Sequence, residues 1–142
     1  LEKTFSTDTF WQTFQSDATS IELTPEQKQQ ISHIVCETYL GQPFSAPPAP
    51  EKLQEVIRNC NHIISSFLQN IHSQIRPDST LCIAVPAWQN HHGQFTHLPL
   101  LKNLNDLGYR QITNKNLLYY RPDQVVGREI LVLKPIDIAK TA

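Results

Sequence analysis

Three short segments carry side chains that could do chemistry, and each follows a stretch with the character of a strand: Asp17-Ala18, Cys36-Glu37-Thr38-Tyr39 and Pro86-Ala87-Trp88. Carboxylates such as Asp17 and Glu37 accept protons and hydrogen bonds, and the rings of Tyr39 and Trp88 can stack on a planar ligand or border its pocket. Plainer roles explain the same residues. Asp17 could hydrogen-bond to the backbone of its own turn, and Glu37 could cap a helix or be solvated. Tyr39 could pack within its loop, and Trp88 could cover the edge of the sheet.

The connection between the last two apolar stretches offers a different chemistry. It contains Arg121, Gln124 and Arg128, and guanidinium groups bind phosphate as planar forks. A hairpin anchored by salt bridges explains these residues equally well.

Three histidines lie on a loop around Gly93, at spacings of one and five that fit no zinc pattern: His91, His92 and His97. We therefore expect no metal site.

These segments need elements to position them, and the clearest is a helix that begins at Glu51. Apolar residues recur at three- and four-residue steps from Leu53 to Ile75, which predicts a long helix with one face on a sheet. Thr24-Pro25-Glu26 predicts the start of a short helix, and residues 98–107 predict an amphipathic helix that Gly108 ends. Strands are predicted at residues 11–15, 31–36, 81–85, 109–112, 117–120 and 129–133.

Alternating strands and helices predict an α/β fold with a parallel sheet and helices on both faces, because a parallel crossover needs about a dozen residues or more. The apolar stretch 31–36 is typical of a strand that is buried on both faces. The last two strands are joined by a hairpin connection, so the final strand should run antiparallel to its neighbour. In such sheets ligands bind beyond the carboxyl ends of the strands, where we expect Asp17, Glu37 and Trp88 to emerge together.

Composition narrows the class of protein. The chain has 142 residues, which suits one domain, and its formal net charge of −1 gives no overall cationic field. Nucleic-acid binding would therefore rest on a local patch or on another domain. No apolar run approaches the roughly eighteen residues of a membrane span, and the N-terminus lacks the layout of a signal peptide. Cys36, Cys60 and Cys82 lie in apolar stretches at unrelated spacings, which indicates reduced thiols in a cytoplasmic protein.

Two stretches resemble a known family. Residues 117–133, Leu-Leu-Tyr-Tyr-Arg-Pro-Asp-Gln-Val-Val-Gly-Arg-Glu-Ile-Leu-Val-Leu, resemble the C-terminus of the RNA-methylase family that includes the tRNA guanosine N2-methyltransferases. Residues 36–43, Cys-Glu-Thr-Tyr-Leu-Gly-Gln-Pro, resemble the loop with that family's catalytic signature of an acidic or amide residue, two prolines and an aromatic residue. The similarity extends over about residues 11–133.

The resemblance implies a class I methyltransferase that uses S-adenosylmethionine and has a Rossmann-like sheet ending in a reversed hairpin. By position, Asp17 and Ala18 would contact the adenine of the cofactor. The catalytic loop would be Cys36, Glu37, Thr38 and Tyr39. In that loop Tyr39 would stack on the target base, and Glu37 would accept from its amine because Cys36 occupies the family's acidic or amide position.

The substrate implied is the exocyclic amine of a nucleic-acid base, in tRNA, with the substrate-facing residues Trp88, Arg121, Gln124 and Arg128. The family's first strand and glycine-rich loop have no counterpart here, which implies that residues 1–142 are the C-terminal half of a methyltransferase domain and are inactive alone. A half-sheet would expose a face and an edge, so the fragment should also tend to dimerise.

Two alternatives come from other classes of protein. Cys36 and Thr38 depart from the family's signature, which favours a catalytically inactive methyltransferase-fold module that only binds. A small stand-alone α/β domain that oligomerises is the other alternative.

Overall fold

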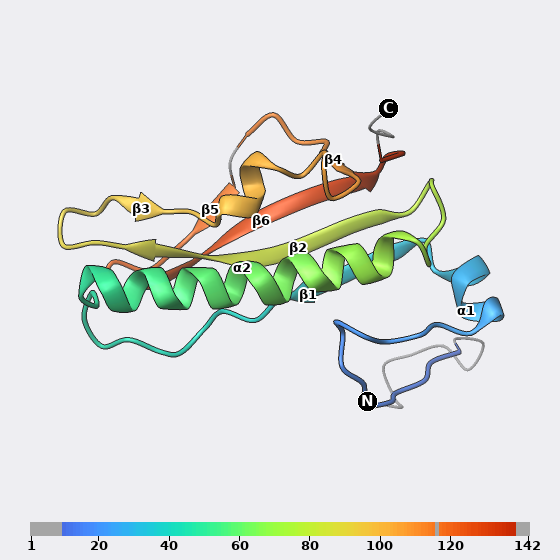
Figure 1. Ribbon diagram of the computed structural model, residues 1–142, viewed down its shortest axis with the longest axis horizontal. Helices are drawn as coiled ribbons and strands as arrows, with labels where there is room; N and C mark the ends of the chain where they lie inside the picture. The colour runs from blue at the N-terminus through green and yellow to red at the C-terminus, as the bar shows by residue number, and fades with distance from the viewer. Residues whose placement is uncertain (1–9, 116, 139–142) are drawn as a thin grey trace.

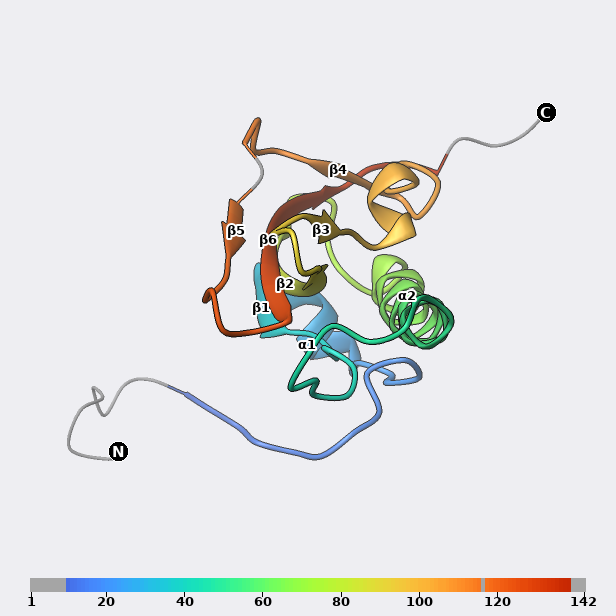
Figure 2. The same cartoon turned by 90° about the vertical axis from the view of Figure 1, so that its left-hand side faces the viewer.

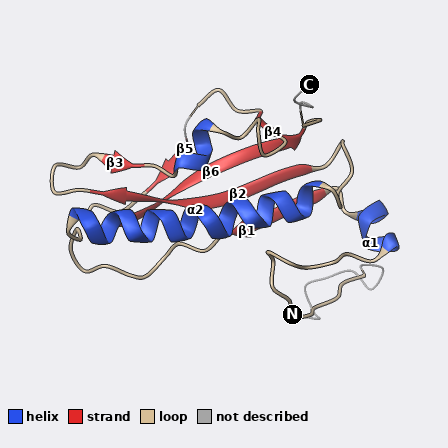
Figure 3. Cartoon of the chain, in the orientation of Figure 1, coloured by secondary structure: helices blue, strands red, loops and turns tan. Residues whose placement is uncertain are grey.

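The computed structural model describes residues 10–115 and 117–138. One long helix lies along a twisted sheet (Figures 1 and 3). In chain order the elements are α1 (Pro25–Gln30), β1 (His33–Glu37), α2 (Pro50–His72), β2 (Thr80–Gln89), β3 (Phe95–Thr96), the 3₁₀ helix η1 (Pro99–Lys102), β4 (Tyr109–Gln111), β5 (Leu117–Tyr119) and β6 (Val126–Pro135). The predicted α/β class is confirmed. No helix within these ranges is long and apolar enough to cross a membrane.

The strands form one mixed sheet in the order β1-β2-β6-β4. β1 and β2 are parallel and are connected through α2, whereas β6 runs antiparallel to β2. Ile130 of β6 pairs with Ala84 of β2 on one side and with Leu117 of β5 on the other. β5 and β4 therefore share the second edge of β6, so the final strand is inserted between β2 and these two short strands. The reversed last strand predicted from the sequence is confirmed. The predicted parallel sheet is wrong for the described residues beyond the pair β1–β2, because every other described strand pair is antiparallel.

The core lies between the sheet and α2. The helix presents an apolar stripe of buried residues: Val56, Ile57, Cys60, Ile64, Leu68 and Ile71. The residues that face it from β2 and β6 are wholly buried: Leu81, Ile83, Val85, Leu131 and Leu133. Pro50 begins the helix, where its missing N–H costs nothing. The helix predicted from Glu51 onward is confirmed.

The opposite face of the sheet is open. Figure 2 shows α2 and η1 on the same side of the sheet, and no described helix covers the other side. Burial alternates along β1, and Val35 is 77% exposed there. The expectations that residues 31–36 are buried on both faces and that helices cover both faces are therefore wrong for the described residues. The reason is that β1 is an edge strand with a single covering layer.

The strand predicted at residues 11–15 is also wrong. Residues 10–16 form no strand, and Phe10, Trp11 and Phe14 are exposed. Aromatic residues favour a strand only where a neighbouring strand completes the hydrogen bonds, and nothing described pairs with this segment.

The short helix α1 is confirmed. Thr24 accepts from the Gln27 backbone N–H, and the Gln27 side chain accepts from the Thr24 N–H, which closes a capping box.

The helix predicted at residues 98–107 is reduced to the 3₁₀ turn η1 followed by further turns. Its leucines are buried as expected, Leu98, Leu100, Leu104 and Leu107 among them. The Leu100 N–H lies in the first turn, where it has no intrahelical acceptor, and Asn61 Oδ1 of α2 accepts it at 2.8 Å. The helix is not continued after Lys102, where the segment holds the poor helix formers Asn103, Asn105 and Asp106. The leucines are therefore buried as their spacing predicts, but in a chain of turns and not in an α-helix.

Gly108 turns the chain into β4 with φ +90°, and a Cβ at this position would collide with the His72 ring, which bonds Ile136 O at 2.8 Å. We predict that Gly108→Ala lowers the free energy of unfolding more than Gly93→Ala. Gly93 also has positive φ (+74°), but its Cβ would meet only Gln89 Nε2 at 3.5 Å. Each change should cost about 1–2 kcal/mol of backbone strain, and Gly108→Ala roughly 1–3 kcal/mol more. Urea unfolding measures both, and equal losses would contradict the collision.

Candidate functional site

Two adjoining pockets lie beyond the carboxyl ends of β1 and β2. The Phe44 pocket, of about 290 Å³, is lined by residues 40–44 on one side and by residues 123–126 and Arg128 on the other. The Asn90 pocket, of about 260 Å³, lies between Ser45, Pro47, the loop after β2 and residues 122–125. Both are lined by Asp123, Gln124 and Val125. They therefore form one hollowed edge of the sheet, where α/β folds bind ligands.

The walls of the pockets are held from opposite directions. On one side Gly41 has φ +81°, and a Cβ there would stand 3.0 Å from Val56 Cγ1 and 3.1 Å from Cys60 Sγ. Only glycine allows the loop to pack so closely on α2 in this conformation. On the other side the Gln89 N–H donates to Val125 O at 2.7 Å, which ties the connection before β6 to the end of β2.

Glu37, the last residue of β1, bridges to β6. Arg128 Nε donates to Glu37 Oε2 at 2.7 Å, and both side chains remain partly open to solvent. Such a solvent-exposed pair contributes about 0–1 kcal/mol to stability, so the ion pair orients Glu37 but is weak enough to be exchanged for another partner. Because Arg128 also lines the Phe44 pocket, this carboxylate adjoins the pocket.

Tyr119 lies beside Arg128 in the register of β5 and β6. Arg121 Nε donates to the Tyr119 hydroxyl at 3.4 Å. This donor and its positive charge, with a smaller contribution from Arg128, lower the pKa of the Tyr119 phenol. From one side of the sheet to the other, Arg121, Tyr119, Arg128 and Glu37 form what we call the polar row.

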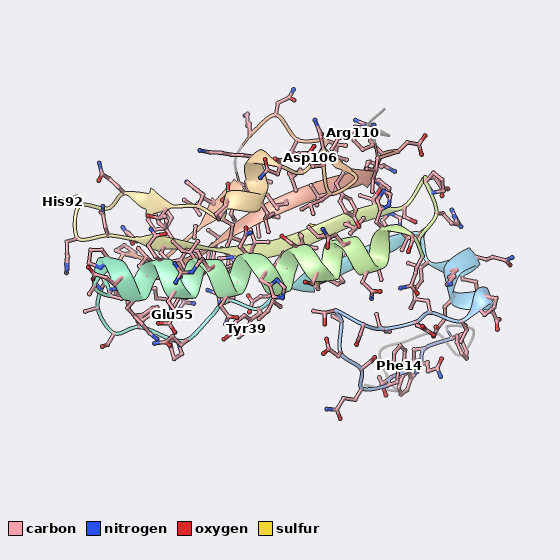
Figure 4. All side chains as sticks on the ribbon, viewed as in Figure 1. Phe14, Tyr39, Glu55, His92, Asp106 and Arg110 are labelled. Atoms are coloured by element: carbon pink, nitrogen blue, oxygen red, sulfur yellow. The ribbon has the colours of Figure 1, made fainter. Side chains whose placement is uncertain are left out.

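The structure brings some of the predicted site residues together. Glu37 contacts Arg128, and Gln124 lines both pockets. Tyr39 is 46% exposed and lies below α2 in the loop after β1 (Figure 4). Thr38 has a structural role, since its backbone N–H and its hydroxyl both donate to Ala84 O at 2.9 Å.

Cys36 lies on the face of the sheet that α2 covers, where it pairs with Ile83 and packs against the core. Burial raises the pKa of the Cys36 thiol. Cys36 is therefore a half-buried residue that packs against the core.

Two predictions about the site are wrong in position. Trp88 is 1% exposed, belongs to the core and lines neither pocket. Its backbone is inside the sheet, with Thr96 of β3 paired on one side and Val126 of β6 on the other. Its indole Nε1 is buried without a hydrogen-bond partner among the described residues. Trp88 is therefore not positioned to contact a substrate.

Asp17 and Ala18 lie at the other end of the molecule. Asn70, in the last turn of α2, donates to Ala18 O at 3.2 Å, and α2 runs back from the carboxyl to the amino ends of the strands. Figure 4 shows Phe14 of the same segment at the end opposite to His92. The Thr19 hydroxyl and backbone N–H donate to Asp17 Oδ1 and lower the pKa of its carboxyl group, as in an ordinary Asx turn. The expectation that Asp17, Glu37 and Trp88 emerge together is wrong.

The sequence prediction missed Asp123 and Asn90. Asp123 lines both pockets, but Pro122-Asp123 has the composition of a plain turn. Asn90 Oδ1 accepts from the His92 and Gln94 backbone N–H groups and closes the loop after β2. Only the insertion of β6 beside β2 brings these two turns together, and no local signal reveals it.

Several solved structures are similar to this chain, including the following two. A proposed DNA modification methylase from Thermus thermophilus is similar with 15% identity and a TM-score of 0.39, over 89% of this chain and 53% of that one. A LepI variant in complex with SAH and a substrate analogue has 12% identity and a TM-score of 0.31, over 79% and 47%. This chain thus spans about half the length of each, and at these TM-scores neither likeness decides the function. No protein-family model matches the chain, and no curated protein matches it.

The contact between Arg121 and Tyr119 makes a prediction that spectroscopy can check. Of the tyrosines, Tyr119 should ionise below the ordinary value near 10, whereas burial raises the pKa of Tyr109. Arg121→Gln removes the donor and the positive charge, so the Tyr119 phenol should then titrate at higher pH. Phenolate absorbance against pH measures the shift. Tyr119→Phe should abolish this step, and Arg110→Gln on β4 should leave it unchanged.

Proposed function

We propose that this chain is the C-terminal half of the catalytic sheet of an S-adenosylmethionine-dependent methyltransferase that acts on the exocyclic amine of a nucleic-acid base in tRNA, in the cytoplasm. The observation that carries the proposal is the strand order β1-β2-β6-β4, with two parallel strands followed by an inserted, reversed final strand. This order agrees with the reversed hairpin that the family resemblance implies.

The hollowed edge supports a role in binding the target base. Tyr39 is exposed, directly precedes the pocket-lining Leu40 and offers a ring for stacking, which contributes roughly 1–3 kcal/mol per base. Gln124 lines the Phe44 pocket and offers an amide that can donate to and accept from a base edge.

Glu37 fits the role of amine acceptor. Methylation of an exocyclic amine requires that the nitrogen lose a proton, and a carboxylate held within hydrogen-bond reach can accept it. The Arg128 side chain holds Glu37 from one side and leaves the second carboxylate oxygen without a hydrogen bond among the described residues. Positioning of the amine against the methyl donor supplies most of the remaining rate acceleration.

The described residues do not by themselves form a site for the cofactor. S-adenosylmethionine supplies the methyl group, but holding its amino-acid end calls for a glycine-rich loop, and Gly41, Gly93, Gly108 and Gly127 stand singly. The position of Asp17 also removes the predicted adenine contact. We therefore assign the cofactor's binding to sheet residues outside this chain. The open face around Val35 and the free edge of β1 are where such strands and helices would join.

A non-catalytic methyltransferase-fold module is the second candidate. The packing of half-buried Cys36 against the core and the structural hydrogen bonds of Thr38 favour it, because both side chains already have structural roles. A small domain that oligomerises through its open face remains a third, supported by the exposure of Val35.

The test of catalysis is transfer of a labelled methyl group to tRNA by a protein that contains these residues within a complete methyltransferase sheet. Glu37→Gln should lower kcat by about 10²–10⁴, because the amide cannot take up the proton. Glu22→Gln changes an exposed carboxylate at the other end of the molecule and should leave kcat unchanged. Undiminished turnover in Glu37→Gln would contradict the acceptor role, and no methyl transfer at all would favour the binding module.

The division of the cofactor site makes a separate prediction. Calorimetric titration of residues 1–142 with S-adenosylmethionine should show no binding, because the residues assigned to its amino-acid end are outside this chain. One-site binding at micromolar affinity would show that the chain holds the cofactor by itself.

A further inference from the structure

Two residues of the polar row, Tyr119 and Arg121, have no role in the proposed methyl transfer. Tyr119 and Arg128 are cross-strand partners, so their side chains lie on the same face of the sheet, the open one. Arg128 lines the Phe44 pocket, and Tyr119 is therefore one strand away from that pocket. Adjacent strands are about 5 Å apart, which is within the reach of one nucleotide.

The Tyr119 ring is exposed but its backbone is firmly placed. The side chain is 53% exposed, although it belongs to a strand and not to a loop. Behind it, Tyr120 packs edge-on against Phe95 with ring centroids 5.0 Å apart. Gly127 permits this packing, since a Cβ there would stand 3.1 Å from Phe95 and 3.2 Å from both Tyr119 O and Tyr120 Cβ. An exposed ring whose backbone is held by strand pairing loses less entropy than one on an unpaired loop when a flat ligand stacks on it.

Positive charge accompanies the ring. Arg121 uses Nε for the Tyr119 hydroxyl, and Arg128 uses Nε for Glu37. The terminal guanidinium nitrogens of both residues bind no acceptor among the described residues. Two guanidinium forks thus flank the ring, and forks of this kind bind phosphate.

We propose that Tyr119 and Arg121 bind the nucleotide next to the target base, with the neighbouring base stacked on Tyr119 and its phosphate held by Arg121. The proposal rests on the proposed function, because it takes the Phe44 pocket as the place of the target base. It assigns to the chain a preference for single-stranded nucleic acid.

The preference for a single strand has two physical reasons. A ring can stack only on a base whose face is free, and a duplex hides those faces. The formal net charge of −1 also gives the chain no overall cationic field for binding a duplex backbone, and Glu37 offsets Arg128. Stacking therefore contributes more than charge, and the dependence of binding on salt should be shallow.

Fluorescence anisotropy tests the proposal with a labelled single-stranded RNA of about twelve nucleotides, the same sequence as DNA, and the RNA duplex. Tyr119→Leu keeps an apolar side chain but removes the ring, and it should weaken single-strand binding about tenfold. Tyr119→Phe should bind like the unchanged protein. Arg121→Gln should weaken binding and reduce the slope of log K against log salt by about 0.7. Equal RNA and DNA affinities would place recognition on base and phosphate, and tighter RNA binding would add the ribose hydroxyl.

Two matched controls separate the site from general effects. Arg110→Gln removes an exposed arginine of β4, which pairs with the end of β6 opposite to Arg128. Phe14→Leu removes an exposed aromatic ring far from the pockets. Neither should change the affinity, and thermal unfolding should show that every variant is folded. Unchanged binding in Tyr119→Leu, a duplex bound as tightly as the single strand, or no binding of any probe would overturn the proposal.

This experiment needs no methyl transfer, so its failure can be told from failure of the proposed function. Loss of single-strand affinity in Tyr119→Leu without any methyltransferase activity in the complete protein would leave the binding site standing and remove the catalytic role. Methyl transfer with a KM for tRNA that Tyr119→Leu does not change would support the catalytic role and remove the binding site at Tyr119.

Discussion

Burial of one face of the sheet against α2 is the constraint on which the rest of the structure depends. The helix is 23 residues long and continuous, and its stripe from Val56 to Ile71 meets wholly buried residues of β2 and β6. At about 25 cal/mol per Å² of apolar surface, this contact is the largest source of stability available to a sheet with a single covering layer. It also fixes direction, because α2 must carry the chain from the carboxyl end of β1 to the amino end of β2.

The hollowed edge follows from that direction. The loop between Thr38 and Pro50 has to reach the start of α2, and Gly41 lets it pack on Val56 and Cys60 on the way. Insertion of β6 beside β2 then brings residues 123–126 against the same loop. Two connections that are distant in sequence thus form one site.

What the sequence could predict depended on whether the signal was local. The spacing of Leu53 to Ile75 predicts α2 because a helix satisfies its own backbone, whereas residues 11–15 fail because a strand needs a partner. Within the site, Glu37, Gln124 and Arg128 were predicted from their places at strand ends and in the final connection. The prediction that Trp88 borders a pocket is wrong because β2 continues past it and pairs there with β3 and β6. The prediction for Asp17 is wrong because residues 11–15, which should have positioned it, form no strand.

The open face also limits how any second layer could be placed. Toward the amino ends of the strands it is apolar, with Val35 exposed and Cys82 and Val132 half-buried, and covering it would be favourable. At the carboxyl end lies the ion pair of Glu37 and Arg128, and burying two charges costs several kcal/mol unless every remaining hydrogen bond is satisfied. A covering layer is therefore favoured over Val35 and disfavoured over the polar row. The boundary between the two regions lies beside the pockets, so a layer that completes the core would leave the candidate site open to its ligand.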